Sequence, residues 1–128
     1  MKIKLRTLLW CQLTFYLLAI GYLAASYLSQ SDGGLAFSTA DPITSGIILT
    51  IYCTFLLAGI LQAHTVYRIL MGISVIGFGY GGVIHHIINY FQTGLEGYAS
   101  FAAWFIAILF NAYGVVFNFI AARGKYEK

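Results

Sequence analysis

Two adjacent histidines, His85 and His86, are the residues of this sequence most suited to a chemical role. They lie in a long apolar stretch beside Gly81 and Gly82, and histidine titrates near neutral pH, so it can relay protons or bind a metal or haem. Neighbouring residues of a helix point about 100° apart, so the two rings cannot easily share one ligand. A site at this position therefore depends on one of the two.

A haem or metal site at His85 lacks further ligands. The third histidine, His64, precedes it by 21 residues, about 30 Å along a helix, so the two cannot hold one iron within a single chain. Zinc needs three or four converging ligands, which the spacing does not offer. Cys11 and Cys53 form no Cys-x-x-Cys pair and are expected to be small buried thiols. We predict no metal and no cofactor; a symmetric dimer joining two copies of His85 stays open for haem.

Catalysis by a nucleophile has no better basis. Ser74 and Ser100 lie in stripes of small residues, and no spacing suggests a nucleophile with a base and an orienting group. The sequence favours a protein that is not an enzyme.

The residues of this chain do not closely resemble those of a known family. The small multidrug exporters, for example, depend on a glutamate in their first helix, where this chain has only Gln12, Thr14 and Tyr16.

Four apolar runs, at about 5–28, 43–63, 67–91 and 98–121, must position these side chains. The 128 residues are 60% hydrophobic and only 9% charged, whereas about a quarter of the residues of a soluble domain are charged. Each run is long enough to cross a bilayer, and four short runs cannot close a barrel. We therefore predict one all-α membrane domain, a four-helix up-down bundle. The first run exceeds a signal-peptide core and is expected to remain as a helix.

Short connections agree with antiparallel helices. Asp41 is predicted to cap the second helix, with Pro42 as its first residue, and 64–66 is predicted to form a tight turn before the third. All seven Lys and Arg residues fall on one side of this topology, and Asp32, Asp41 and Glu96 on the other. The positive-inside rule then places both termini in the cytoplasm. Anionic lipid headgroups explain this basic side, and no patch suggests nucleic acid.

Helical periodicity assigns an interior face to each of the last two helices. In the third, this face holds Met71, Ser74, Phe78, Gly81, Gly82, His85 and Asn89, with His86 at its edge. In the fourth, it holds Ser100, Ala103, Ala107, Asn111, Gly114, Asn118 and Ala121. Small residues at such spacing allow close helix contact, and the asparagines can form hydrogen bonds between helices. We expect Gly81, Gly82, Ala107 and Gly114 to serve packing.

His85 is expected to face inward at the level of Asp41 and Glu96, its candidate partners. A structural hydrogen bond to a neighbouring Asn, Tyr or Ser is favoured over proton relay. Polar groups at membrane depth often mark function, so His85, Asn89, Asn111 and Asn118 are also candidates for a polar path.

Two functions follow from these faces. The favoured one is a non-catalytic interaction or assembly subunit, which packs against itself or a larger complex in a plasma-type membrane, most simply a bacterial inner membrane. The alternative is a small oligomeric transporter or channel for an ion or small solute.

Overall fold

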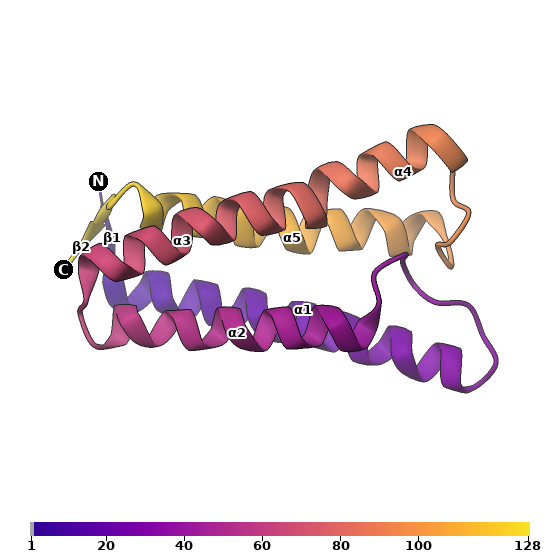
Figure 1. Ribbon diagram of the computed structural model, residues 1–128, viewed down its shortest axis with the longest axis horizontal. Helices are drawn as coiled ribbons and strands as arrows, with labels where there is room; N and C mark the ends of the chain where they lie inside the picture. Colours follow the sequence, from indigo (N-terminus) through magenta and orange to yellow (C-terminus); the bar gives the residue numbers. More distant parts are fainter. Residues whose placement is uncertain (1) are drawn as a thin grey trace.

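The structure, a computed structural model, describes residues 2–128 as four antiparallel helical stretches joined by short loops (Figure 1). They are α1 (Leu5–Ser31); α2 (Pro42–Ile60); a continuous third stretch made of α3 (His64–Gly79), the π-helix η1 (Tyr80–Ile84) and α4 (His85–Thr93); and α5 (Phe101–Ala122). Each stretch is long and apolar enough to cross a membrane. The four predicted helices are therefore confirmed.

The two ends of the bundle differ. Both termini and the α2–α3 turn lie together at one end, which we call the terminal end (Figure 1). The α1–α2 and α4–α5 loops lie at the opposite end, the loop end. Around the bundle, α1 packs against α2 and α5, and α3 packs against the same two helices.

Helix boundaries follow local hydrogen bonds. The Asp41 carboxylate accepts a hydrogen bond from the Thr44 N–H at 2.9 Å, and Pro42 is the first residue of α2, as predicted. The α2–α3 turn was expected at 64–66 but lies one turn earlier, because α2 ends at Ile60 and Gln62 takes a positive φ of 58°. His64 consequently begins α3. Ser100 is the cap of α5: its hydroxyl accepts from the Ala103 N–H at 3.1 Å.

The predicted interior face of α5 is confirmed over most of its length. Its buried residues are Ala103, Ala107, Gly114, Asn118 and Ala121. A Cβ added at Gly114 would lie 2.5 Å from the Phe15 ring of α1, so only glycine fits at this helix contact. Close approach of the backbones through small residues is the packing mode typical of apolar bundles.

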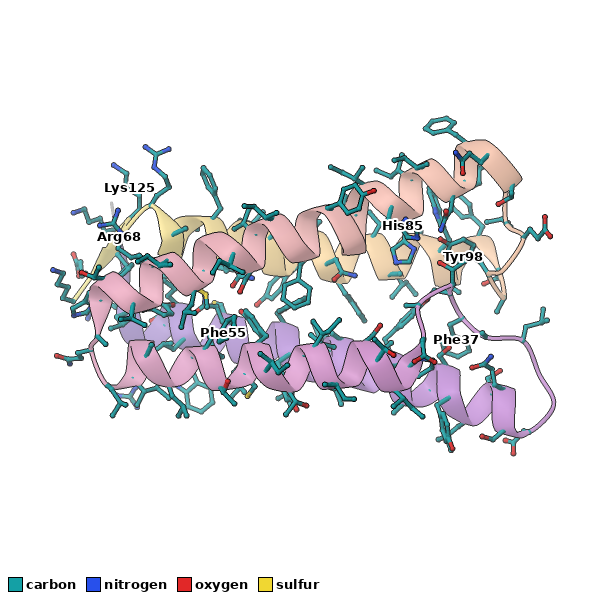
Figure 2. The ribbon with its side chains drawn as sticks, in the orientation of Figure 1. Phe37, Phe55, Arg68, His85, Tyr98 and Lys125 are labelled. Atoms are coloured by element: carbon teal, nitrogen blue, oxygen red, sulfur yellow. The ribbon has the colours of Figure 1, made fainter. Side chains whose placement is uncertain are left out.

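A clasp of the two termini closes the terminal end. The strands β1 (Ile3–Lys4) and β2 (Tyr126–Glu127) pair in parallel. Tyr126 is buried, and its hydroxyl lies 3.0 Å from Nδ1 of His64. The Arg68 Nε–H donates to the Ala122 carbonyl at 3.2 Å, which ties the start of α3 to the end of α5. Arg68 and Lys125 mark this end in Figure 2.

The clasp should respond to alkaline pH. Burial raises the pKa of the Tyr126 phenol above its ordinary value, and the nearby Arg68 opposes that shift. Because the folded state favours the neutral phenol, its contribution to stability should be complete below about pH 10 and lost as the pH rises through the folded pKa. Thermal unfolding in mild detergent should therefore show a smaller alkaline loss for Tyr126→Phe than for the wild type. Tyr27→Phe alters an exposed phenol and serves as the control; equal losses in all three proteins would contradict the prediction.

Candidate functional site

One polar network joins all four helical stretches inside the terminal half of the bundle. Gln12 of α1 lies at its centre and is fully buried. Its Nε2 donates to Oδ1 of Asn118 in α5 at 3.0 Å and contacts the sulfur of Met71 in α3 at 2.9 Å. The Tyr52 hydroxyl of α2 donates to the same Asn118 oxygen at 2.6 Å, and the Tyr67 hydroxyl of α3 donates to Gln12 Oε1.

The Asn118 amide is only partly satisfied. Its oxygen accepts two hydrogen bonds, whereas its Nδ2 is buried without a partner in the described part of the chain. Neutral amides cost less to bury than charges, and each satisfied bond contributes about 1 kcal/mol net. The network therefore fits a role in fixing how the helices pack.

An aromatic cluster separates this network from the loop end. Phe15, Tyr52 and Phe78 contact one another edge to face, with ring centroids 5.2–5.4 Å apart. Phe15 packs on Gly114, which lies between Asn111 and Asn118 along α5. Two members of the predicted polar path, Asn111 and Asn118, are thus divided by an apolar layer.

A second cluster surrounds His86 near the loop end. The Tyr98 hydroxyl lies 2.7 Å from Nδ1 of His86, and Nδ2 of Asn89 donates to the same hydroxyl and to Thr39, both at 3.2 Å. The Trp104 indole N–H donates to the His86 carbonyl at 2.8 Å. Either neutral tautomer of His86 fits this contact, because the Tyr98 hydroxyl can donate to Nδ1 or accept from Nδ1–H while it also accepts from Asn89.

The prediction that His85 faces inward is wrong, and the π-helix explains the error. A π turn contains about one residue more than an α turn, so every residue after it is rotated by about 100° relative to an uninterrupted α-helix. Met71 and Ser74, before the turn, are buried as predicted, but after it His86 is buried and His85 is exposed. In Figure 2 the His85 ring extends from α4 on the side turned toward α2. The histidine bonded to a tyrosine is therefore His86.

The glycines at the π turn have different surroundings. Gly82 is buried against the Asn111 side chain, with which an added Cβ would overlap. Ala107 and Gly114 are buried as well, and the packing role of these three residues stays a prediction. Gly81 is exposed, and no atom within 4 Å would meet an added Cβ, so it does not pack inside this chain.

A cavity of about 180 Å³ lies between this π turn and the start of α2. Its polar lining residues are Tyr22, Ser38, Ser45, His86 and Asn111. The Asn111 Nδ2 donates to the Ala107 carbonyl of its own helix at 2.8 Å, and the Tyr22 hydroxyl donates to the Ala103 carbonyl at 2.7 Å. Of the four residues predicted for a polar path, Asn111 alone lines this cavity.

The carboxylates predicted as partners of His85 have other surroundings. Asp41 caps α2, and its hydrogen bonds from Thr44 hold the pKa of that carboxyl below its usual value. Glu96 lies in the α4–α5 loop, where its backbone N–H donates to the Thr93 carbonyl. Neither carboxylate is hydrogen bonded to His85 in the part of the chain that the structure describes.

Sequence reasoning missed three members of the polar network. These members are Gln12, Tyr52 and Tyr67. In the sequence, Gln12 is a lone amide in an apolar run and Tyr52 belongs to a repeating stripe of α2, but no pattern predicts that either residue contacts Tyr67. Within residues 2–128, no group of three or more His, Cys, Asp or Glu side chains could hold a metal ion. No family model, curated protein sequence or solved structure matches this chain.

Substitution of Gln12 should be costly because several helices depend on it. Gln12→Leu preserves the size of the side chain but leaves the Tyr67 hydroxyl without its acceptor and removes one of the two donors to Asn118 Oδ1. We expect a loss of about 1–3 kcal/mol in the free energy of unfolding, measured by denaturant titration in mixed micelles. Thr14→Val, at an exposed site of the same helix, should change it by less than about 0.5 kcal/mol. Equal losses in the two variants would exclude a central role for Gln12.

Substitution of the two histidines should have different effects on thermal stability, because His86 is buried and His85 is exposed. His86→Phe keeps an aromatic ring but removes the partner of the Tyr98 hydroxyl, so the unfolding midpoint should fall by several degrees. His85→Phe changes an exposed side chain and should leave the midpoint within about one degree. A larger loss for His85→Phe would restore the inward orientation predicted from the sequence.

Proposed function

We propose that this chain is a multi-pass integral membrane protein that acts as a non-catalytic interaction or assembly subunit, packing against a helix of a second copy or of a larger membrane complex. The exposed surfaces of its helices support a membrane location. Large apolar side chains remain exposed on every helical stretch, for example Leu17, Ile47, Ile76 and Phe119. In water such a surface would be unfavourable, whereas lipid solvates it.

Charge supports a defined orientation. The basic residues belong to the segments that meet at the terminal end, and Asp32, Asp41 and Glu96 belong to the loops at the other end. By the positive-inside rule, the terminal end would face the cytoplasm. A plasma-type membrane, most simply a bacterial inner membrane, is the proposed location.

The observation that carries the assembly role is a strip of two open glycines on the third stretch, Gly77 and Gly81, the second of which borders the cavity beside α2. Gly77 and Gly81 lie four residues apart, both are exposed, and nothing within 4 Å would meet a Cβ added at either one. Exposed Ile73, Ile76 and Tyr80 border the strip. Glycine weakens a helix by about 1 kcal/mol relative to alanine. Two exposed glycines at this spacing are typical of a surface on which another helix packs closely.

The interior residues support this choice of face. Gly82, Ala107 and Gly114 are buried in contacts within the chain. On the third stretch an added Cβ would meet nothing at Gly72, Gly77 or Gly81, and of these three Gly77 and Gly81 are exposed. Their strip begins in α3 and ends in η1, close to the exposed His85.

Substitution of the strip tests this proposal. The double substitution Gly77→Leu, Gly81→Leu should abolish the oligomer, or the association with a copurifying partner. The protein is purified in mild detergent, and its molar mass is measured by light scattering. Gly21→Leu, at an exposed and open position of α1, is the matched control and should leave the assembly intact. A wild-type protein that is monomeric and free of partners, or an assembly that survives the double substitution, would refute the proposal.

A small oligomeric transporter or channel is the second candidate, favoured by the cavity lined by His86 and Asn111. The cluster of Phe15, Tyr52 and Phe78 counts against a continuous path through one chain. Flux of protons or small solutes across vesicles containing the protein separates the two candidates. Flux that is blocked by Asn111→Leu, in protein that remains folded, would favour transport.

A further inference from the structure

A groove of about 740 Å³ runs between α1 and α2 at the terminal end, away from both polar clusters. Its walls are apolar and include Leu9, Leu13, Leu56, Leu57 and Ile60. Trp10, which is 60% exposed, also lines it. Leu13 lies seven residues beyond Arg6 in α1, so the apolar part extends about 10 Å along the helix from the basic residues.

The end of the groove nearest the termini is basic. Lys4, Arg6 and Lys128 line it, together with one carboxylate, that of Glu127. None of the three cationic groups has a hydrogen-bond or ion-pair partner within residues 2–128. By contrast, Arg68 donates to a backbone carbonyl, and the Arg123 guanidinium lies 5.8 Å from the centre of the Phe119 ring. The cations of the groove are thus available to a ligand, and the side chains that line this end carry three positive charges and one negative charge.

We infer that this groove binds one anionic glycerophospholipid, with its phosphate at Lys4, Arg6 and Lys128 and an acyl chain against the leucines behind them. Charge at one end and apolar walls beyond it complement an anionic headgroup joined to a hydrocarbon chain. The proposed orientation places this end at the headgroup level of the cytoplasmic leaflet, where anionic lipids are enriched. The inference rests on the proposed membrane location but not on the assembly strip of α3.

The fluorescence of Trp10 can report which lipid occupies the groove. The chain has two tryptophans, so Trp104→Phe leaves Trp10 as the single tryptophan, whose emission is excited selectively at the red edge of the absorption band. Bromine atoms on an acyl chain quench a tryptophan that they contact. The protein is placed in phosphatidylcholine vesicles that contain phosphatidylglycerol, with the bromines on either lipid in matched series. We expect stronger quenching by brominated phosphatidylglycerol than by brominated phosphatidylcholine at equal mole fraction.

The basic residues should set this preference. Juxtamembrane basic residues attract anionic lipid with a strength that corresponds to about fivefold in binding for each residue. Arg6→Gln and Lys4→Gln should each reduce the preference for phosphatidylglycerol by up to about that factor, and together they should abolish it. Arg123→Gln removes a cation at the same end of the bundle but outside the groove, so it is the control and should keep the preference.

Three outcomes would overturn the inference. Equal quenching by the two lipids would mean that Trp10 contacts only bulk lipid. Loss of the preference on addition of glycerol phosphate or inorganic phosphate would make the basic cluster a site for free phosphate. Quenching by neither lipid, with quenching by aqueous iodide instead, would refute the membrane location as well. Failure of the assembly proposal alone would leave the preference intact in the Gly77→Leu, Gly81→Leu protein.

Discussion

The amide of Gln12 is the interaction on which the arrangement of the helices depends most. Apolar contacts between helices are non-directional, and in lipid the hydrophobic effect gives little reason for one helix to prefer another. The hydrogen bonds from Tyr67 to Gln12, from Gln12 to Asn118 and from Tyr52 to Asn118 are directional and link all four stretches at one level. A helix rotated or shifted by one residue would lose them. This network selects one packing among many apolar alternatives of similar contact area.

The π turn in the third stretch has the next largest consequence. It brings His86 to Tyr98 and leaves His85 exposed, and it presents Gly82 to Asn111 while Gly81 stays exposed. Gly82 permits this close contact because it has no Cβ to clash with Asn111 of the neighbouring helix. The terminal half is closed by the clasp and the polar network. Beyond the π turn, α4 bends away from α2 (Figure 1). The small cavity is lined by residues of the π turn and of the start of α2.

Hydropathy and its period predict the four helices and the interior stripe of α5, and the Asp41-Pro42 pair predicts the cap of α2. The hydropathy pattern does not predict the orientation of His85, since one additional residue in a helical turn changes the face of every later residue. Nor does it predict the Gln12 network. A lone amide in an apolar run reveals that a partner is needed, but the identities of Tyr52, Tyr67 and Asn118 as partners depend on the depth at which separate helices meet. The α2–α3 turn was misplaced because a positive φ at Gln62 has no strong sequence signal.

The positions of the small and charged residues limit the surfaces at which a partner can bind. The polar groups that the sequence offers at membrane depth are largely engaged within the chain: Asn118 with Tyr52 and Gln12, His86 with Tyr98, and Asn111 with its own helix. A side chain engaged in this way contributes little to recognition at the surface. The features not engaged are exposed, namely the strip of Gly77 and Gly81, the side chain of His85 and the basic groove between α1 and α2. The strip and the groove lie on different helices, so a protein partner and a lipid could be bound at the same time without competing for the same surface.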